Sequence, residues 1–369
     1  MMNVKAGALL LAVFVVAVSG RVAAADAVRP AYKVGVTQRR FVPPEPYDWR
    51  GARTHALFAT VWYPAAPAAR ETQQWIGPPR APLARAGRAA PEADLAAAPR
   101  EFPLVVISHG TGGSALALGW LGTRLASQGL VAVAVNHPGN TALEPYTAQG
   151  FTLWWLRARD LSVAIDGMLA DPQFGSRIDP HRIGAAGFSL GGYTMIEIAG
   201  GRSSARLFDS CERAPHGRSC IAPPEFPNLI DKVVTLLKTD PAYRVATRDA
   251  GASYRDPRVR AVFAIAPALG TVLVPDSLAR ISIPVQIVAG SADAIAPVTV
   301  NAKYIAAHVP GSRLVIFPGA GHYAFFASCT AQGKKAEPEI CVDRAGIDRD
   351  QLHVRTAALA SAFFSRYLN

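Results

Sequence analysis

The 369-residue sequence lacks the short motifs that mark common metal and nucleotide sites. It contains no His-Glu-x-x-His segment, and the spacing of its four cysteines fits no zinc site. A Gly-x-x-x-x-Gly-Lys-Ser/Thr loop is also missing, which excludes a P-loop nucleotide site. We therefore expect a protein that needs neither a metal nor a cofactor.

Charged residues are scarce, at 18% of the chain, while half of the residues are hydrophobic. A chain of this length and composition can bury a sizeable core, which excludes a disordered protein. The net charge is +11, but the basic residues are scattered and no basic run exceeds two residues. We interpret the excess as a solvated surface and expect no nucleic-acid partner.

Long apolar runs are missing except at the N-terminus. Residues 6–18 are apolar, follow Lys5, and precede the small-residue pattern of Ala23 and Ala25. This arrangement predicts a secretory signal peptide over residues 1–25, because a membrane anchor takes about 20 apolar residues. We expect residues 26–369 to form a single periplasmic or secreted domain, with no stable membrane insertion after cleavage.

The four cysteines are Cys211, Cys220, Cys329 and Cys341. In an exported chain an even number of cysteines predicts disulfides, and four cysteines allow three pairings. We favour Cys211–Cys220 and Cys329–Cys341, because each pair closes a short local loop.

Strand and helix patterns alternate along most of the chain. The ranges 32–37 and 55–64 predict two antiparallel strands, and residues 64–103 predict a long surface connection. Further strands are expected in the apolar runs 102–110, 130–139, 181–189, 258–268, 283–293 and 312–322. Helices are expected at 118–129, 155–172, 191–200, 298–308 and 350–367. This alternation predicts an α/β fold with a mostly parallel central sheet and helices on both faces.

The alternation lapses between residues 200 and 256. That range contains prolines, one cysteine pair and a short helix pattern near 228–239. We interpret it as an insertion over the C-terminal edge of the sheet, where a lid would lie. A surface decoration without a role is the alternative.

One serine stands between glycines in the segment RIGAAGFSLGGYTM, residues 182–195. Gly187 and Gly191 flank Ser189 at two residues' distance, after an apolar run and before a helix pattern. Gly-x-Ser-x-Gly in this context predicts a sharp strand-to-helix turn that exposes the serine hydroxyl. Ser189 is therefore the candidate nucleophile.

A serine nucleophile needs a base, and the base needs an acid that orients it. His322 follows a predicted strand within a glycine-bounded loop, and Asp293 follows the strand before it. Asp276 is the rival acid, and His109 and His137 also follow strands. The order Ser189, Asp293, His322 is the nucleophile, acid, base order of α/β-hydrolases.

Backbone amides near the serine complete the candidate site. We expect the oxyanion hole to use the amides of Leu190, directly after the nucleophile, and Thr111 in the segment SHGTGGS. The same segment matches a dinucleotide fingerprint, but the next strand ends in NHPG without the acidic residue that this fingerprint requires.

These segments resemble a known group of proteins. VWYPA, LVVISHGTGGS, VNHPGNT, RIGAAGFSLGGYTM, VAGSADAIAP and GAGHYAFF are similar to bacterial predicted dienelactone hydrolases related to platelet-activating-factor acetylhydrolases. The resemblance implies the α/β-hydrolase fold, catalytic positions at Ser189, Asp293 and His322, and oxyanion positions at Thr111 and Leu190. Dienelactone hydrolases use a cysteine where this chain has Ser189, and the acetylhydrolases keep Asp276 open as the acid.

The combined prediction is a serine carboxylic-ester hydrolase that forms an acyl-enzyme on Ser189 and takes a small-molecule ester as substrate. Candidate pocket residues are Phe188, Trp154, Trp155 and Phe325. A peptidase or amidase of the same fold, and a non-catalytic binding protein, are the alternatives.

Overall fold

The computed structural model describes residues 32–213, 223 and 225–368. Within them, eleven strands form one sheet in the order β10-β9-β8-β7-β5-β6-β2-β1-β4-β11, with β3 paired to β4. The strands are β1 (Lys33–Phe41), β2 (Leu57–Ala65), β3 (Thr72–Ile76), β4 (Ala84–Pro91), β5 (Phe102–Ser108), β6 (Val131–Val135), β7 (Ile178–Phe188), β8 (Val259–Ile265), β9 (Val285–Gly290), β10 (Arg313–Phe317) and β11 (Ser328–Cys329).

The central strands run parallel, as the alternation of strands and helices predicts. β10, β9, β8, β7, β5 and β6 pair in parallel register, whereas β2 runs antiparallel to both β1 and β6. Strands β5, β6 and β9 are buried along their whole length, because helices cover both faces of the sheet. The carboxyl ends of the parallel strands therefore meet at one edge, where loops carry the candidate side chains.

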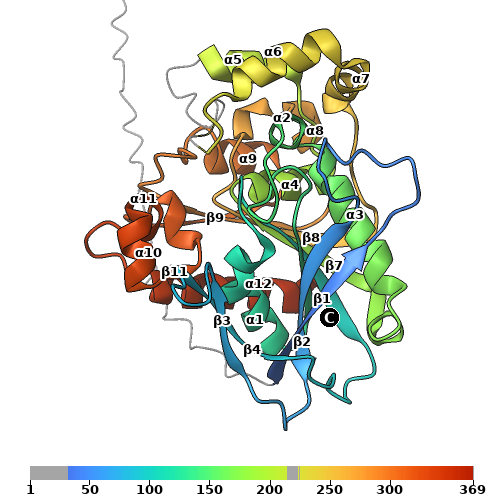
Figure 1. Ribbon diagram of the computed structural model, residues 1–369, viewed down its shortest axis with the longest axis vertical. Coiled ribbons are helices and arrows are strands. Elements are labelled where there is room, and N and C mark those ends of the chain that lie inside the picture. Colours follow the sequence, from blue (N-terminus) through green and yellow to red (C-terminus); the bar gives the residue numbers. More distant parts are fainter. Residues whose placement is uncertain (1–31, 214–222, 224, 369) are drawn as a thin grey trace, which may run out of the picture.

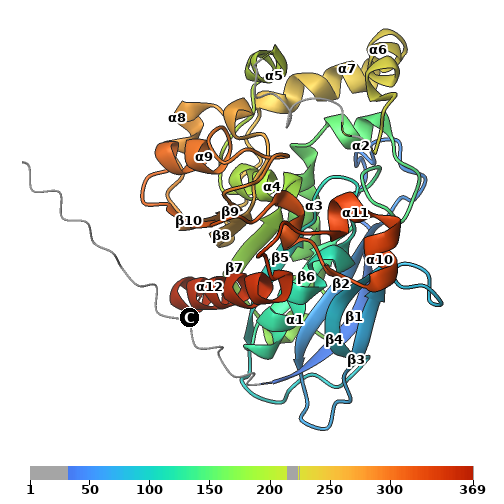
Figure 2. The ribbon, with the colours of Figure 1, turned by 90° about the vertical axis from the view of Figure 1, so that its left-hand side faces the viewer.

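Two helical layers sandwich the sheet, with β7 and β8 between them (Figure 2). One layer contains α1 (Gly119–Ser127) and α12 (Arg349–Leu368), and the other contains α3 (Leu156–Leu169) and α4 (Leu190–Ile198). The remaining helices are α2 (Ala148–Thr152), α5 (Ala205–Arg213), α6 (Leu229–Thr239), α7 (Pro241–Arg248), α8 (Pro275–Leu278), α9 (Ala302–His308), α10 (Ala331–Ala336) and α11 (Pro338–Cys341). Short 3₁₀ turns are η1 (Ala115–Leu118), η2 (Gly175–Arg177), η4 (Asp249–Gly251), η5 (Gly270–Val272) and η6 (His322–Phe325). The predicted α/β-hydrolase architecture is confirmed.

The prediction of a long surface connection over residues 64–103 is wrong. β3 and β4 lie within that range, and β4 pairs with β1, β3 and β11. The sequence of β4, ARAGRAAP, has none of the β-branched and aromatic residues typical of strands, so its pattern was not visible. Its small residues have a packing role instead: a Cβ added at Gly87 of β4 would lie 2.6 Å from Thr123 Oγ1 of α1.

The described part of the insertion between α4 and β8 contains the helices α5, α6 and α7. Figure 1 shows α5, α6 and α7 together at one end of the molecule, above α2 and α4. The predicted disulfide between Cys329 and Cys341 is present and joins β11 to α11. Cys220, and with it the predicted Cys211–Cys220 pair, lies outside the described residues.

The predicted signal peptide, residues 1–25, also lies outside the described residues. In the part of the chain that the structure describes, no helix combines the length and apolar character needed to cross a membrane.

Candidate active site

Ser189 lies at the strand-to-helix turn between β7 and α4. Its backbone has φ 58° and ψ −118°, a conformation that non-glycine residues rarely adopt. The flanking glycines permit this turn: a Cβ at Gly187 would lie 2.3 Å from the Gly191 carbonyl oxygen, and one at Gly191 would lie 2.0 Å from the Ser108 carbonyl oxygen. The turn therefore places the hydroxyl above the N-terminus of α4, where the helix dipole favours negative charge.

The structure brings Ser189, His322 and Asp293 together. His322 Nε2 lies 2.8 Å from Ser189 Oγ, and His322 Nδ1 lies 2.7 Å from Asp293 Oδ2. The second Asp293 oxygen accepts the backbone amides of Ile295 and Ala296, which holds the carboxylate in place. An imidazole in this position can accept the serine proton while the carboxylate fixes its tautomer.

The rival acid does not take part in this arrangement. Asp276 is exposed in α8, and the Nδ1 atom of His322 is already hydrogen-bonded to Asp293. Asp293 is therefore the carboxylate that geometry assigns to His322.

The amides expected to form the oxyanion hole lie beside the serine. As the first residue of α4, Leu190 has an amide without an intrahelical acceptor. Within the described residues the amide of Thr111 donates to no protein acceptor either, whereas its neighbour Gly112 donates to Asn140 Oδ1 at 2.8 Å. A Cβ at Gly110 would lie 3.2 Å from Ser189 Cβ, so the Thr111 loop touches the nucleophile turn.

His109 and His137 belong to a separate buried network behind this loop. The His137 backbone amide donates to His109 Nε2 at 3.2 Å, so Nδ1 of His109 carries the proton and donates to the Gly110 carbonyl at 2.6 Å. Burial and the nearby Arg157 guanidinium lower the pKa of both imidazoles well below the usual value. Neither histidine reaches Ser189, so neither replaces His322 as its base.

A mostly apolar cavity of about 480 Å³ lies between the insertion and the sheet. Thr111 and Leu190 line one end of it, and residues of α5, α6 and α7 line the other. Trp154 and Trp155 line it as predicted, but Phe188 and Phe325 do not. Phe325 is fully buried against Phe317 in the core below η6, and Phe188 packs against the His322 ring.

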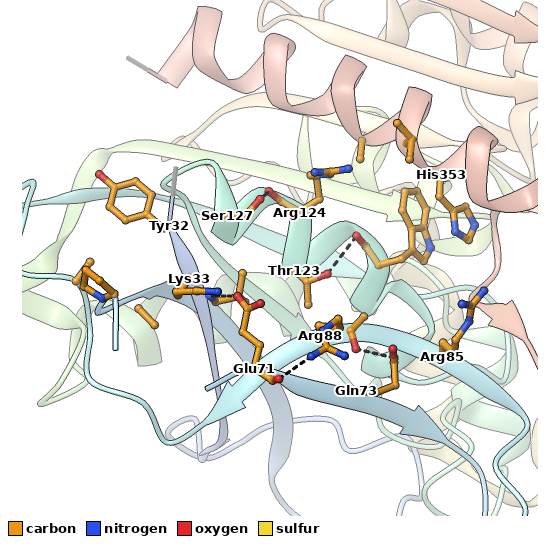
Figure 3. Close-up of a pocket in the computed structure, with 18 of the residues that line it drawn as sticks. Tyr32, Lys33, Glu71, Gln73, Arg85, Arg88, Thr123, Arg124, Ser127 and His353 are labelled. Carbon is orange, nitrogen blue, oxygen red and sulfur yellow. Dashed lines mark hydrogen bonds between the residues drawn. The ribbon is translucent and has the colours of Figure 1, made fainter. Parts of the chain in front are cut away.

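A second, larger cavity of about 1020 Å³ lies away from Ser189, His322 and Asp293 (Figure 3). Its walls come from β1, β4, α1 and α12, and Figure 3 shows Arg124 of α1 on the side of α12 and Arg88 of β4 bound to the Glu71 carbonyl on the other side. None of the predicted site residues lines this cavity. Within the described ranges, no group of three or more His, Cys, Asp or Glu side chains is arranged to hold a metal ion.

Two features of the site escaped the sequence analysis. Asn140, which anchors Gly112, lies in the segment VNHPGNT, whose resemblance was the only signal that pointed to it. Glu197 of α4 is fully buried, and burial raises its pKa to about 7 although Tyr193 and Ser203 donate hydrogen bonds to it. No local pattern marks a buried carboxyl within an apolar helix.

Several curated ester hydrolases align with parts of the chain. A lipase of Moraxella sp. (strain TA144) is 39% identical over 87 residues, which are 24% of each chain. A cutinase of Thermobifida alba is 35% identical over 109 residues, 28% of this chain and 33% of the cutinase. A bis(hydroxyethyl) terephthalate hydrolase of Streptomyces coelicolor is 35% identical over 103 residues, 28% of this chain and 30% of that protein. The chain thus spans about a quarter to a third of the length of these relatives.

Structural and family comparisons cover more of the chain. The structure of a ferulic acid esterase from Streptomyces cinnamoneus superposes with a TM-score of 0.61 over 93% of this chain and 92% of that one. The identity is 21%, so this likeness concerns the fold. The model of the alpha/beta hydrolase family matches residues 104–331, which is more than half of the chain and runs from within β5 to the start of α10. This protein belongs to the alpha/beta hydrolase family.

Proposed function

We propose that this protein is a serine carboxylic-ester hydrolase that works through an acyl-enzyme on Ser189. The observation that carries the proposal is the hydrogen-bonded order Ser189–His322–Asp293 at a strained turn. The aligned relatives support the reaction class, because their names describe a lipase, cutinases and a terephthalate-ester hydrolase.

The geometry supports a two-step mechanism. Ser189 Oγ attacks the ester carbonyl while His322 Nε2 takes its proton, and Asp293 stabilises the imidazolium that forms. The amides of Thr111 and Leu190 bind the oxyanion, and His322 then protonates the departing alkoxide. Water activated by His322 attacks the acyl-enzyme and releases the carboxylic acid.

The cavity beneath the insertion supports an apolar substrate group. It begins at Thr111 and Leu190 and continues between aromatic and aliphatic side chains of α2, the turn between α2 and α3, α6 and α7. Burial of apolar surface favours binding by about 25 cal/mol per Å², so an apolar acyl or alcohol group gains affinity there. The helices α5, α6 and α7 act in this proposal as the predicted lid over the site.

The finer assignments remain predictions. The likeness to dienelactone hydrolases and platelet-activating-factor acetylhydrolases, the signal peptide over residues 1–25 and the single-domain boundary belong to this group. Export to the periplasm or the medium agrees with the Cys329–Cys341 disulfide, because disulfides persist in oxidising compartments.

The test combines covalent labelling with turnover. A fluorophosphonate probe is expected to modify the protein once, at Ser189, and mass spectrometry of the digested protein locates the modified residue. Purified protein is expected to hydrolyse p-nitrophenyl esters and to leave a matched panel of peptide p-nitroanilides uncleaved. Preferential anilide cleavage would favour a peptidase, and absence of both labelling and turnover would favour a binding protein.

A further inference from the structure

The loop that carries the Thr111 amide has little rigidity of its own. It runs from the end of β5 to η1, and glycines stand at positions 110, 112 and 113. Gly112 has a left-handed backbone with φ +61°. Glycine-rich chain has more conformational freedom than any other, so contacts outside the loop have to fix the direction of the Thr111 N–H.

Gly112 is held from both sides. Its amide donates to Asn140 Oδ1 at 2.8 Å, and its carbonyl accepts the Tyr146 hydroxyl at 2.9 Å. Asn140 is 1% exposed, and its Nδ2 donates to the Gly150 carbonyl at 3.2 Å, which fixes which end of the side chain faces Gly112. Because peptide units are planar, only the φ and ψ of Thr111 separate its N–H from the held Gly112 unit.

The segment that contains Asn140 runs alongside the whole loop. The Ala142 amide donates to the Gly113 carbonyl at 2.9 Å, and the Ala115 amide donates to Asn136 Oδ1 at 2.9 Å. Residues 136–146 therefore hold Gly112, Gly113 and Ala115 through four hydrogen bonds, and the bond from Asn140 is the one at the amide next to Thr111.

We propose that Asn140, assisted by Tyr146, is a positioning residue of the oxyanion hole. It acts through Gly112 and keeps the amide of Thr111 directed at the place where the ester oxygen becomes negative. The inference rests on the proposed ester-hydrolase function. An oxyanion forms only in the transition state, so loss of this alignment lowers kcat and leaves KM nearly unchanged.

The test compares two buried asparagines with the same kind of hydrogen bond. Asn301 is also 1% exposed, accepts the Gly270 amide at 2.8 Å and donates to the Pro297 carbonyl at 3.0 Å, but it does not line the apolar cavity. We expect Asn140→Ala to lower kcat about 10- to 100-fold, because loss of a whole oxyanion donor lowers it about 10²- to 10³-fold. Asn301→Ala is expected to lose thermal stability to a similar degree and keep its kcat within about threefold.

Inhibitor affinity separates positioning from general damage. A trifluoromethyl ketone forms a tetrahedral oxyanion on the serine, so its inhibition constant is expected to rise in Asn140→Ala in parallel with the fall in kcat, while KM changes less than threefold. Tyr146→Phe removes only a hydroxyl from a half-buried ring, and it keeps the test open if Asn140→Ala fails to fold. We expect Tyr146→Phe to lower kcat about 3- to 10-fold with the same parallel rise.

Two outcomes would overturn the inference. One is an Asn140→Ala protein with kcat and inhibitor affinity no worse than those of Asn301→Ala. The other, if Asn140→Ala does not fold, is a Tyr146→Phe protein with wild-type kcat and inhibitor affinity. In either case wild-type turnover and Ser189 labelling would stand, whereas their absence would refute the proposed function itself.

Discussion

The molecule contains two hydrogen-bonded Ser–His–Asp sets, and the hydrogen bonds in the two sets have nearly the same lengths. In the site, Ser189 Oγ is 2.8 Å from His322 Nε2, and His322 Nδ1 is 2.7 Å from Asp293. Behind it, Ser108 Oγ is 2.9 Å from His137 Nε2, and His137 Nδ1 is 2.6 Å from Asp160. We name the second set the Ser108 network.

The surroundings of the two sets differ. Ser108, His137 and Asp160 have no exposed surface, and Asp160 is paired with the Arg50 guanidinium at 2.7 Å. Arg157 donates to Ser108 Oγ at 3.3 Å, so a cation lies against the hydroxyl. Ser189 instead lies in a strained turn beside two amides that face the apolar cavity. A hydrogen-bonded Ser–His–Asp set is therefore not sufficient for a catalytic site. The serine also needs access for a substrate, a turn that exposes its hydroxyl, and amides that can bind an oxyanion.

The largest expected difference is in turnover after removal of each serine. Ser189→Ala is expected to lower kcat about 10⁴- to 10⁶-fold, because it removes the hydroxyl that is hydrogen-bonded to His322. Ser108→Ala is expected to lower kcat less than tenfold and to reduce stability by about 1–3 kcal/mol through the lost buried hydrogen bond. Ester hydrolysis and urea unfolding of both variants measure this contrast. Equal losses of kcat in the two variants would contradict the assignment of Ser189 as the nucleophile.

Replacing the carboxylate of each set is expected to affect different properties: catalysis for Asp293 and stability for Asp160. Asp293→Asn gives His322 the wrong tautomer and is expected to lower kcat about 10⁴-fold in a folded protein. Asp160→Asn leaves the buried Arg50 guanidinium without its counterion and is expected to reduce the free energy of unfolding by about 3–5 kcal/mol. A stable, active Asp160→Asn protein would show that the Ser108 network is dispensable.

The sequence predicts one of these two sets and misses the other. Ser189 is recognisable because a strained turn needs glycines at fixed spacing, and Asp293 and His322 because both follow strands whose ends meet at one edge. The Ser108 network joins β5, the loop after β6 and α3 through contacts between residues 29 and 23 positions apart, and its Asp160 pairs with Arg50, which is 110 positions away. No periodicity or spacing marks such contacts.

Strand β4 and the cavity walls are further features that the sequence does not predict, because they depend on contacts between distant residues. β4 is specified by its neighbours β1, β3 and α1, because alanine-rich chain has low strand preference of its own. Phe188 and Phe325 are apolar and close to site residues in sequence, yet tertiary packing turns Phe325 into the core. Proximity along the chain predicts which loop carries a residue, whereas the direction of its side chain depends on packing.

A second buried carboxyl, Glu197, extends the comparison. Glu197 is as buried as Asp160, but within the described residues no arginine forms an ion pair with it, and burial raises its pKa to about 7. An unfolded glutamate ionises near 4.5, so the folded state binds the extra proton between pH 4.5 and 7 and loses stability as the pH rises through that range. The total loss is about 3 kcal/mol.

Glu197→Gln removes this titration. We expect the free energy of unfolding of the variant to lose its decline between pH 5 and 7 and to exceed that of the wild type at pH 8. Urea unfolding at pH 5, 6, 7 and 8 measures the effect. A decline of the same slope in both proteins would assign it to another group.

The smallest expected effect concerns the charge on His137. Burial and the Arg157 charge lower its pKa well below 6.5, so the imidazole stays neutral in the folded protein while an unfolded histidine gains a proton. The unfolded state then binds more protons, and stability is lost as the pH falls below 6.5, by about 1 kcal/mol at pH 5.5. Nitrogen-15 chemical shifts of the His137 ring are expected to stay those of a neutral imidazole from pH 8 to 5.5. Titration of that ring near pH 6.5 would show that the Ser108 network opens to solvent, which is the one condition under which it would come to resemble the Ser189 site.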